Sequence, residues 1–350
     1  NFNPDTPFCP AGTYRATPDV FFDDFETGTD GWTIGKIKGQ SAWSLSSANA
    51  ASGTASLWAD DAYSKTNSYV TTKGIKLAVG SKPYLHFTHS YNFEASGTTY
   101  YDGGILEYSL NNGSTWVDAK ALFSSGQNYK GVIKTANANP LGGRNAFVGQ
   151  SHGYVDSRYN LTTLAGKNVL LRWRIGTDAA TAVSGWYVDD VSIYYCVSIP
   201  SVPALLAPVN DALLTDLTPT FDWSDSTPDL HHYQLQVATD SAFTENLVTY
   251  DTIPTSTFSL SADLNAATTY YWRVRAFNAA NKASAWSAYR TIRTVFAAPA
   301  GGMVNNGDPL ATLTPPFSWD AVPSATSYRI QISADNNFTT WLVDESVDTN

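Results

Sequence analysis

The segment Leu85-His86-Phe87-Thr88-His89-Ser90-Tyr91-Asn92-Phe93 alternates large rings and leucine with smaller or more polar side chains. Successive side chains of a β-strand point to opposite faces, so a period of two predicts a strand with one buried face. The same alternation recurs at residues 105–109, 169–175 and 186–193, while helical periodicity is hard to find. The sequence therefore predicts an all-β fold.

Turn-forming residues separate these predicted strands. Asn111-Asn112-Gly113-Ser114 is a strong hairpin signal, because Asn and Gly tolerate the positive φ that tight hairpin turns require. The pairs Gly103-Gly104 and Gly142-Gly143 are interpreted as turns for the same reason. Residues up to Cys196 are therefore expected to form one β-sandwich.

Beyond Cys196 the sequence contains an internal repeat. A short segment with prolines, residues 197–202, is interpreted as a linker. After it, residues 217–223 match residues 313–319 at an offset of 96, and residues 233–237 match residues 328–332 at an offset of 95. A period of this length predicts tandem sandwich modules instead of a solenoid of small repeats.

The second copy of the repeat ends at Asn350, before any counterpart of Trp272 and Val274. A sandwich without these strands would expose unpaired backbone groups and half of its core. We expect either that the native chain continues past Asn350 or that another chain supplies the missing strands. In the second case residues 295–350 would be a self-association surface.

Composition and charge exclude some classes of function. The 350 residues contain 21 Lys and Arg against 31 Asp and Glu, a net charge of −10 without any basic run, which argues against nucleic-acid binding. No window approaches the ~18 consecutive apolar residues of a membrane span. The chain begins at Asn1 without an initiator Met, so we expect a secretory signal to have been removed or to lie upstream. The low lysine content and many aromatic residues are typical of a secreted or cell-surface β protein.

The two cysteines, Cys9 and Cys196, lie 187 residues apart and bracket the first predicted domain. A disulfide between them would tie its first and last strands together. Closing so long a loop is worth ~4–5 kcal/mol in the chain-entropy model. The alternative is a pair of free buried thiols.

Three groups of motifs in this part of the chain carry a resemblance. They are Phe22-Asp23-Asp24-Phe25-Glu26 with Gly31-Trp32, Tyr101-Asp102-Gly103-Gly104 with residues 106–109, and Gly185-Trp186-Tyr187-Val188-Asp189-Asp190-Val191. In this order they resemble a MAM-like jelly roll, the domain found downstream of the catalytic domain in secreted bacterial metalloproteases of the thermolysin-like and immune-inhibitor type. The residues of the repeat resemble fibronectin type III modules.

These observations together predict a domain organisation. The fold is expected to be all-β, with a jelly-roll β-sandwich followed by tandem immunoglobulin-like (fibronectin type III) sandwiches. The expected divisions are an N-terminal extension at 1–8, the jelly roll at 9–196, a linker at 197–202, one module at 203–294 and a partial second module at 295–350.

Signals for catalysis are weak. The metalloprotease signature H-E-x-x-H is absent. Residues 149–153 fit the G-x-S-x-G pattern around Ser151, but residues 154–159 alternate like a strand, whereas a nucleophile elbow opens a helix. His86 and His89, three apart on a strand, point to opposite faces and do not chelate one ion. We expect no catalytic residue and no enzymatic activity, with a serine hydrolase as the minor alternative.

Clustered carboxylates suggest a structural metal site. Acidic residues surround the first predicted strand, follow Trp58 and lie in the last strand; the resemblance implies a structural calcium ion near such positions. Ca²⁺ prefers ~6–8 oxygen ligands, which loops supply readily. The alternative is a set of separate solvated acids and turn caps. The predicted ligands are Asp24, Glu26, Asp61, Asp189 and Asp190.

The predicted function is that of a calcium-stabilised, non-catalytic extracellular accessory or adhesion region of a secreted protease-like precursor, with a protein or glycan surface as partner. One alternative is a structural subunit of an extracellular filament, surface layer or larger complex. Another is a glycan-binding module, whose aromatic rings would stack on sugars. The candidate rings are Tyr100, Tyr101, Tyr129, Tyr154 and Tyr159.

Overall fold

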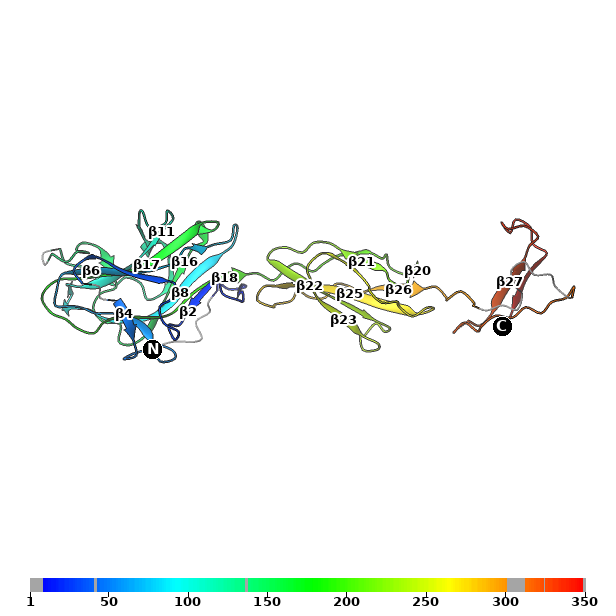
Figure 1. Ribbon diagram of the computed structural model, residues 1–350, viewed down its shortest axis with the longest axis horizontal. Helices are drawn as coiled ribbons and strands as arrows, with labels where there is room; N and C mark the ends of the chain where they lie inside the picture. Colours follow the sequence, from blue (N-terminus) through cyan, green and yellow to red (C-terminus); the bar gives the residue numbers. More distant parts are fainter. Residues whose placement is uncertain (1–8, 41–42, 136–137, 301–311, 324, 349–350) are drawn as a thin grey trace. The chain divides into compact units, whose positions relative to one another are not determined.

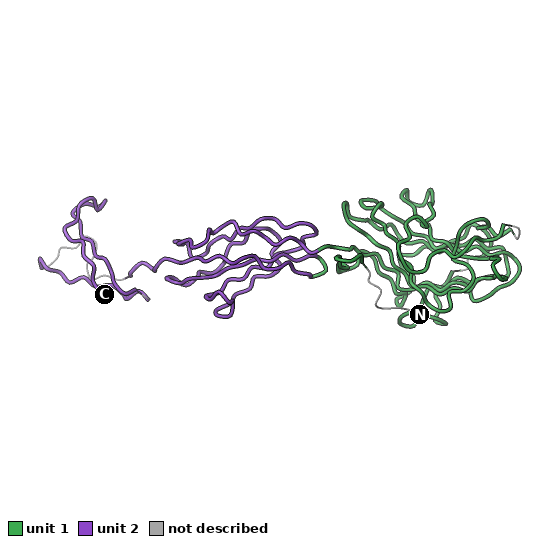
Figure 2. The backbone as a smooth tube through the Cα atoms, turned by 180° about the vertical axis from the view of Figure 1, so that it is seen from behind, with its two compact units in different colours: residues 1–198, 279–281 green, residues 199–278, 282–350 purple. Residues whose placement is uncertain are grey.

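The computed structural model describes residues 9–40, 43–135, 138–300, 312–323 and 325–348 (Figure 1). The predicted extension at 1–8 and residues 301–311 of the predicted second module lie outside these ranges. The chain divides into two compact units, residues 1–198 with 279–281 and residues 199–278 with 282–350 (Figure 2). The described residues are almost entirely strands and loops, which confirms the predicted all-β class. They contain no helix long and apolar enough to cross a membrane.

The described residues of the first unit form two large antiparallel sheets and two short two-stranded ones. The order of the first sheet is β13 (Phe123–Gly126), β16 (Val155–Asn160), β8 (Pro83–Asn92), β18 (Gly185–Val197), β5 (Ser56–Ala59) and β4 (Trp43–Ser46), with β1 (Tyr14–Arg15) and β2 (Phe21–Asp23) also paired to β18. The order of the second sheet is β12 (Val117–Asp118), β11 (Gly103–Ser109), β17 (Asn168–Thr177), β6 (Thr66–Thr72) and β3 (Trp32–Lys38), with β7 (Ile75–Lys76) paired to β17. Short elements complete the unit: β9 (Ala95–Ser96), β10 (Thr99–Tyr100), β14 (Gly131–Val132), β15 (Asn145–Ala146) and the 3-10 turns η1 (Ala119–Leu122) and η2 (Thr162–Leu164).

The core of this unit lies between the two sheets. The predicted inner face of β8 is buried, with Leu85 and Phe87 fully inaccessible, and Phe87 packs edge-on against Trp173 of the second sheet. The other face of β8 is also buried, contrary to simple alternation. Its Tyr84 packs with Tyr194 and with the disulfide that joins Cys9 to Cys196. From the sequence, Cys9 and Cys196 could form either a disulfide or a pair of free buried thiols, and the structure contains the disulfide.

The predicted turns have mixed outcomes. The hairpin at residues 111–114 is confirmed, because β11 pairs with β12 across it and Asn112 and Gly113 have φ of 56° and 85°. The prediction of a turn at Gly103-Gly104 is wrong, because these are the first two residues of strand β11. A Cβ atom on Gly104 would lie 2.3 Å from the Trp186 ring, so glycine there serves close packing between the sheets.

The second unit begins with an immunoglobulin-like sandwich. One sheet has the order β19 (Leu205–Ala207), β21 (Thr220–Trp223) and β24 (Thr257–Ser259). The other has the order β20 (Ala212–Leu214), β26 (Arg290–Thr294), β25 (Thr269–Asn278), β22 (Leu230–Ala238) and β23 (Val248–Ile253). Phe221 and Trp272 pack against each other in the core.

The described part of the second repeat forms one hairpin, β27 (Tyr328–Ile332) with β28 (Val343–Val347). Its residues are less buried than their counterparts in the first copy. Phe317 is 43 % exposed, whereas Phe221 is fully buried. Burial of Phe221 depends on β25, and the described residues of the second copy contain no equivalent of that strand.

Candidate metal centre

Four acidic residues meet at one end of the jelly roll because each lies next to the end of a strand. Asp61 follows β5, Glu94 follows β8, Asp178 follows β17 and Asp102 precedes β11. The register of β11 with β17 pairs Gly103 with Gly176, which brings Asp102 beside Asp178. The backbone N–H of Asp178 donates to Asp102 Oδ1 at 2.7 Å.

Asp61 and Glu94 come together from the other sheet. The start of β18 lies between β5 and β8, with Trp186 paired to Ala59 and Gly185 paired to Asn92. The backbone N–H of Glu94 donates to Asp61 Oδ2 at 3.2 Å. Gly185 has a φ of 77°, and a Cβ atom there would lie 2.0 Å from the Ala59 carbonyl oxygen. Glycine therefore permits this close approach, and the cluster joins the two sheets.

The carboxylates are close together and mostly buried. Oxygen atoms of Glu94, Asp102 and Asp178 lie within 4.8 Å of one another. Asp61 and Asp102 are fully buried, and Asp178 is 2 % exposed. In the part of the chain that the structure describes, no ion pair joins Asp61, Asp102 or Glu94 to a basic side chain. Asp61 Oδ1 and Asp102 Oδ2 have no hydrogen-bond partner there.

Burial and mutual repulsion shift the pKa values of the two innermost groups. Burial raises the pKa of Asp61 to about 9, and the neighbouring Asp102 carboxylate adds to the shift. Burial also raises the pKa of Asp102 to about 6, against the lowering effect of the Asp178 N–H. A buried carboxylate without a countercharge is costly. The arrangement therefore requires either bound protons or a cation.

The donor set fits a hard divalent cation. All of the side-chain donors are carboxylate oxygens, the ligand type that Ca²⁺ prefers, and two ligands on opposite sides of a Ca²⁺ ion lie roughly 4.6–5.2 Å apart. Asn139 also stabilises the site. Its Nδ2 donates to Asp102 Oδ1 at 3.0 Å and to the Tyr101 and Gly176 carbonyl oxygens at 2.8 Å. Glu94, Asp102 and Asp178, with Asp61 adjoining, are the residues that could hold calcium.

The structure does not bring the five sequence-predicted ligands into one group. Asp61 belongs to the buried cluster, whereas the others lie around residues 51–55. There Glu26 accepts from the Thr54 and Ala55 N–H groups at 2.8 and 2.7 Å, and Asp189 accepts from the Ala51 N–H at 2.7 Å. Asp190 accepts from the Ser52 hydroxyl at 2.7 Å, and Asp24 accepts from the Glu26 N–H at 3.3 Å. Glu26, Asp189 and Asp190 thus anchor the loop at 51–55 with their hydrogen bonds, whereas Asp24 caps its own turn.

Three residues of the buried cluster were missed from sequence. Asp102 was noted within the Tyr101-Asp102-Gly103-Gly104 motif, but the two glycines suggested a turn. Glu94 directly follows the predicted strand that ends at Phe93, and Asp178 lies three residues after the predicted strand 169–175; this position near a strand end is the signal that could have found them. Which strand ends meet depends on the sheet order, and alternation does not encode that order.

Ser151 is held as a structural residue. Its hydroxyl donates to the Gly153 carbonyl oxygen at 2.8 Å and accepts from the Tyr91 N–H at 2.9 Å. No helix follows, since the next element is β16. The hydroxyl thus closes a loop onto the end of β8.

Two of the five candidate sugar-stacking tyrosines are unsuited to that role. Tyr159 is fully buried in the main core. Tyr129 packs edge-on against Phe147, and its hydroxyl contacts the backbone of Leu106. Tyr100, Tyr101 and Tyr154 remain partly exposed.

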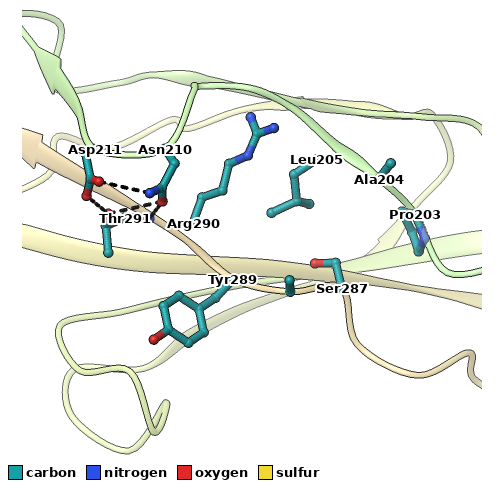
Figure 3. Close-up of a pocket in the computed structure, with 10 residues that line it drawn as sticks. Pro203, Ala204, Leu205, Asn210, Asp211, Ser287, Tyr289, Arg290 and Thr291 are labelled. Carbon is teal, nitrogen blue, oxygen red and sulfur yellow. Dashed lines mark hydrogen bonds between the residues drawn. The ribbon is translucent and has the colours of Figure 1, made fainter.

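The immunoglobulin-like module contains a pocket of about 530 Å³, shown in Figure 3. The polar groups that line it bond to one another. Arg290 Nη1 donates to the Leu206 and Pro208 carbonyl oxygens, each at 2.8 Å. The Thr291 N–H donates to Asn210 Oδ1 at 2.9 Å. The pocket therefore lies between residues 203–211 and β26, and these hydrogen bonds hold the two segments together.

Comparison with known families identifies the fold of one segment. Residues 209–298 match a family model described as the Rha78A-like, N-terminal immunoglobulin domain. The match agrees with the immunoglobulin-like module predicted there. No curated protein matches the chain in sequence.

Solved structures resemble parts of the chain at low identity. The glycoside hydrolase domain of Endo-D from Streptococcus pneumoniae R6 is 16 % identical, with 74 % of this chain and 37 % of that chain covered and a TM-score of 0.29. The K1 cleaved adhesin domain of Lys-gingipain from Porphyromonas gingivalis W83 is 14 % identical, with 49 % and 96 % covered and a TM-score of 0.32. The CBM22-1 xylan-binding domain of Xyn10C from Paenibacillus barcinonensis is 15 % identical, with 52 % and 97 % covered and a TM-score of 0.31. At these values the likenesses carry no inference about function.

Proposed function

We propose that the chain is a non-catalytic extracellular binding or adhesion segment whose jelly roll is stabilised by Ca²⁺ held by Glu94, Asp102 and Asp178, with Asp61 adjoining. The observation that carries the metal proposal is the pair of buried oxygens, Asp61 Oδ1 and Asp102 Oδ2, that lack any hydrogen-bond partner among the described residues. A cation between the two sheets would neutralise this charge and tie four strand ends together.

The binding role is supported by the architecture. β-sandwich modules are rigid scaffolds that present surface loops, where binding residues are concentrated. Ser151, the residue with the strongest catalytic motif, has its hydroxyl bonded to backbone groups. An extracellular setting is supported by the disulfide between Cys9 and Cys196, because disulfides persist mainly in oxidising compartments.

The MAM-like motifs support a more specific form of the proposal. In it the chain is the accessory region of a secreted protease-like precursor and uses its jelly roll to bind a protein or glycan surface. A structural subunit of an extracellular assembly is the second candidate.

Calcium removal tests the metal proposal directly. An ion that binds only the native state stabilises that state by mass action, by about 2.7 kcal/mol at a free concentration 100 times its Kd. We expect excess chelator to lower the melting temperature of the jelly roll in differential scanning calorimetry, and added Ca²⁺ to restore it. An unchanged melting temperature in chelator would refute the site.

Two variants show whether calcium binds at the buried cluster or at the loop anchored by Glu26. Asp102→Asn should abolish the calcium-induced rise in melting temperature, because it removes a ligand charge while preserving shape. Glu26→Gln is the matched control and should keep the full rise, since Glu26 bonds only Thr54 and Ala55. The reverse pattern would restore the ligand set predicted from sequence.

A further inference from the structure

A polar groove lies on the jelly roll beside the acidic cluster. It consists of two hollows of about 350 and 550 Å³, which share Asn92, Gln150 and His152 in their linings. The first hollow is also lined by Asn49 and Tyr187, and the second by Glu94, Tyr100, Lys130 and Thr181. We call these two adjoining hollows the amide groove. Each falls within the size range of small-ligand sites.

The groove offers hydrogen-bonding groups that the protein leaves free. The side-chain amides of Asn92 and Gln150 have no hydrogen-bond partner within the described residues, although their backbones form an isolated bridge. An amide carries both a donor and an acceptor. Such groups match the hydroxyls of a sugar, each of which donates and accepts.

An aromatic surface borders the same groove. The Tyr187 ring is partly exposed and lies 6.2 Å from the Trp58 ring, with an angle of 32° between the planes. Tyr187 pairs with Ser90 of β8, two positions before Asn92. The Tyr187 ring and the Asn92 amide therefore stand on paired strands of one sheet, a rigid support that favours a specific site, and the isolated bridge holds Gln150 beside Asn92.

The charge of the groove favours an uncharged ligand. Lys130, Glu94 and the His152 imidazole are its titratable side chains, in a chain of net charge −10. Glu94 also belongs to the acidic cluster, where a cation would neutralise it. Lys130 is the one lysine or arginine in the two linings, and Glu94 lines the same hollow, so the groove lacks the paired Lys or Arg side chains that usually hold an anion.

One wall of the groove depends on the acidic cluster. The Thr181 N–H donates to Glu94 Oε2 at 3.4 Å, and Thr181 and Val183 both line the groove. Residues 178–183 therefore connect the cluster to the groove. Their position is determined by the carboxylates that would hold the ion.

We infer that the amide groove binds a neutral, hydroxyl-rich polysaccharide, and that calcium in the adjacent cluster is required because it holds the 178–183 wall. This inference rests on the proposed binding role and its metal site. Tyr187 supplies a stacking face, while Asn92 and Gln150 bond sugar hydroxyls.

Affinity gel electrophoresis of the full chain tests the inference. Native gels contain a soluble xylan, β-glucan or galactomannan, with polysaccharide-free gels as the reference and polygalacturonate as the anionic comparison. We expect the chain to be retarded by at least one neutral polymer in calcium and not by polygalacturonate. The variant Asn92→Ala/Gln150→Ala should lose retardation. Asn145→Ala, an exposed amide outside the groove, is the matched control and should keep it.

The outcomes distinguish the groove from the metal site. Equal mobility in every gel, or full retardation of Asn92→Ala/Gln150→Ala, would overturn saccharide binding in this groove while leaving the calcium-dependent melting intact. Retardation that persists in chelator, under conditions where the melting temperature has fallen, would overturn the role of calcium in holding the wall. Retention of melting temperature in chelator would refute the metal site itself.

Discussion

His89 shows how a single buried side chain makes stability depend on pH. It is fully buried, and Trp186 Nε1–H donates to its Nδ1 at 3.1 Å. Its Nε2 must then carry the proton, which it donates to Ser157 Oγ at 2.9 Å. Ser157 in turn donates to the Gln127 carbonyl oxygen at 2.6 Å. A second proton on the imidazole would face the Trp186 N–H, so the fold selects the neutral form.

The pKa of His89 predicts acid sensitivity. Burial lowers this pKa from 6.5 to about 3, and the nearby His86 adds to the shift; burial lowers the pKa of His86 to about 3 as well. Between these values the unfolded chain binds protons that the folded chain does not, so stability falls as pH falls from 6.5 towards 3. Each histidine contributes up to about 1.4 kcal/mol per pH unit.

We expect His89→Gln to reduce the slope of the unfolding free energy against pH by up to about 1.4 kcal/mol per pH unit. Denaturant titrations of the full chain at several pH values between 4 and 6.5, with His86 unchanged, measure the slope. A variant with the same slope as the native chain would show that His89 does not contribute to the acid sensitivity.

At the scale of single elements, β11 shows why its first residues must be small. Gly104 pairs with Ile175 of β17 and bridges Phe147, while the Trp186 ring from the facing sheet lies where its side chain would be. Trp186 is fully buried and packs against Phe147 and His89, so the ring has little room to move.

Gly104→Ala should therefore destabilise the jelly roll by ~1–3 kcal/mol, the usual cost of overpacking a filled core. Chemical denaturation followed by tryptophan fluorescence measures the change. Gly113→Ala is an instructive comparison, because its φ of 85° is strained for alanine but a Cβ atom there would make only an ordinary contact, 3.6 Å from Trp116 Cζ2. If Gly104→Ala left stability unchanged, the two sheets would have to be less tightly packed than the structure indicates.

At the scale of the whole molecule, the two units have separate hydrophobic cores. The disulfide lies within the first unit, where it closes a loop with a sequence separation of 187. In the chain-entropy model such closure is worth ~4–5 kcal/mol. Loss of the disulfide should therefore lower the stability of the first unit and leave that of the second unit unchanged.

We expect Cys9→Ser/Cys196→Ser to lower the melting temperature of the jelly roll and to leave that of the immunoglobulin-like module unchanged. The module thus serves as an internal control in one calorimetric scan of the full chain. An equal drop in both transitions would contradict independent unfolding of the two units.

The sequence by itself determined the all-β class, the hairpin at residues 111–114 and the immunoglobulin-like module. These features depend on local properties: the period of two along β8, the positive φ that Asn112 and Gly113 tolerate, and the spacing of the repeat. Acidic residues next to strands also led to the prediction of a metal site, and of the five predicted ligands Asp61 lies in the buried carboxylate cluster.

The tertiary structure alone decided which carboxylates meet. Asp102 and Asp178 are 76 residues apart in the chain, and the register of β11 with β17 joins them. Asp189 and Glu26 are turned instead towards the N–H groups of residues 51–55. The physical reason is that alternation specifies the face of each side chain, whereas sheet order and register specify its neighbours, and these depend on packing across the whole core.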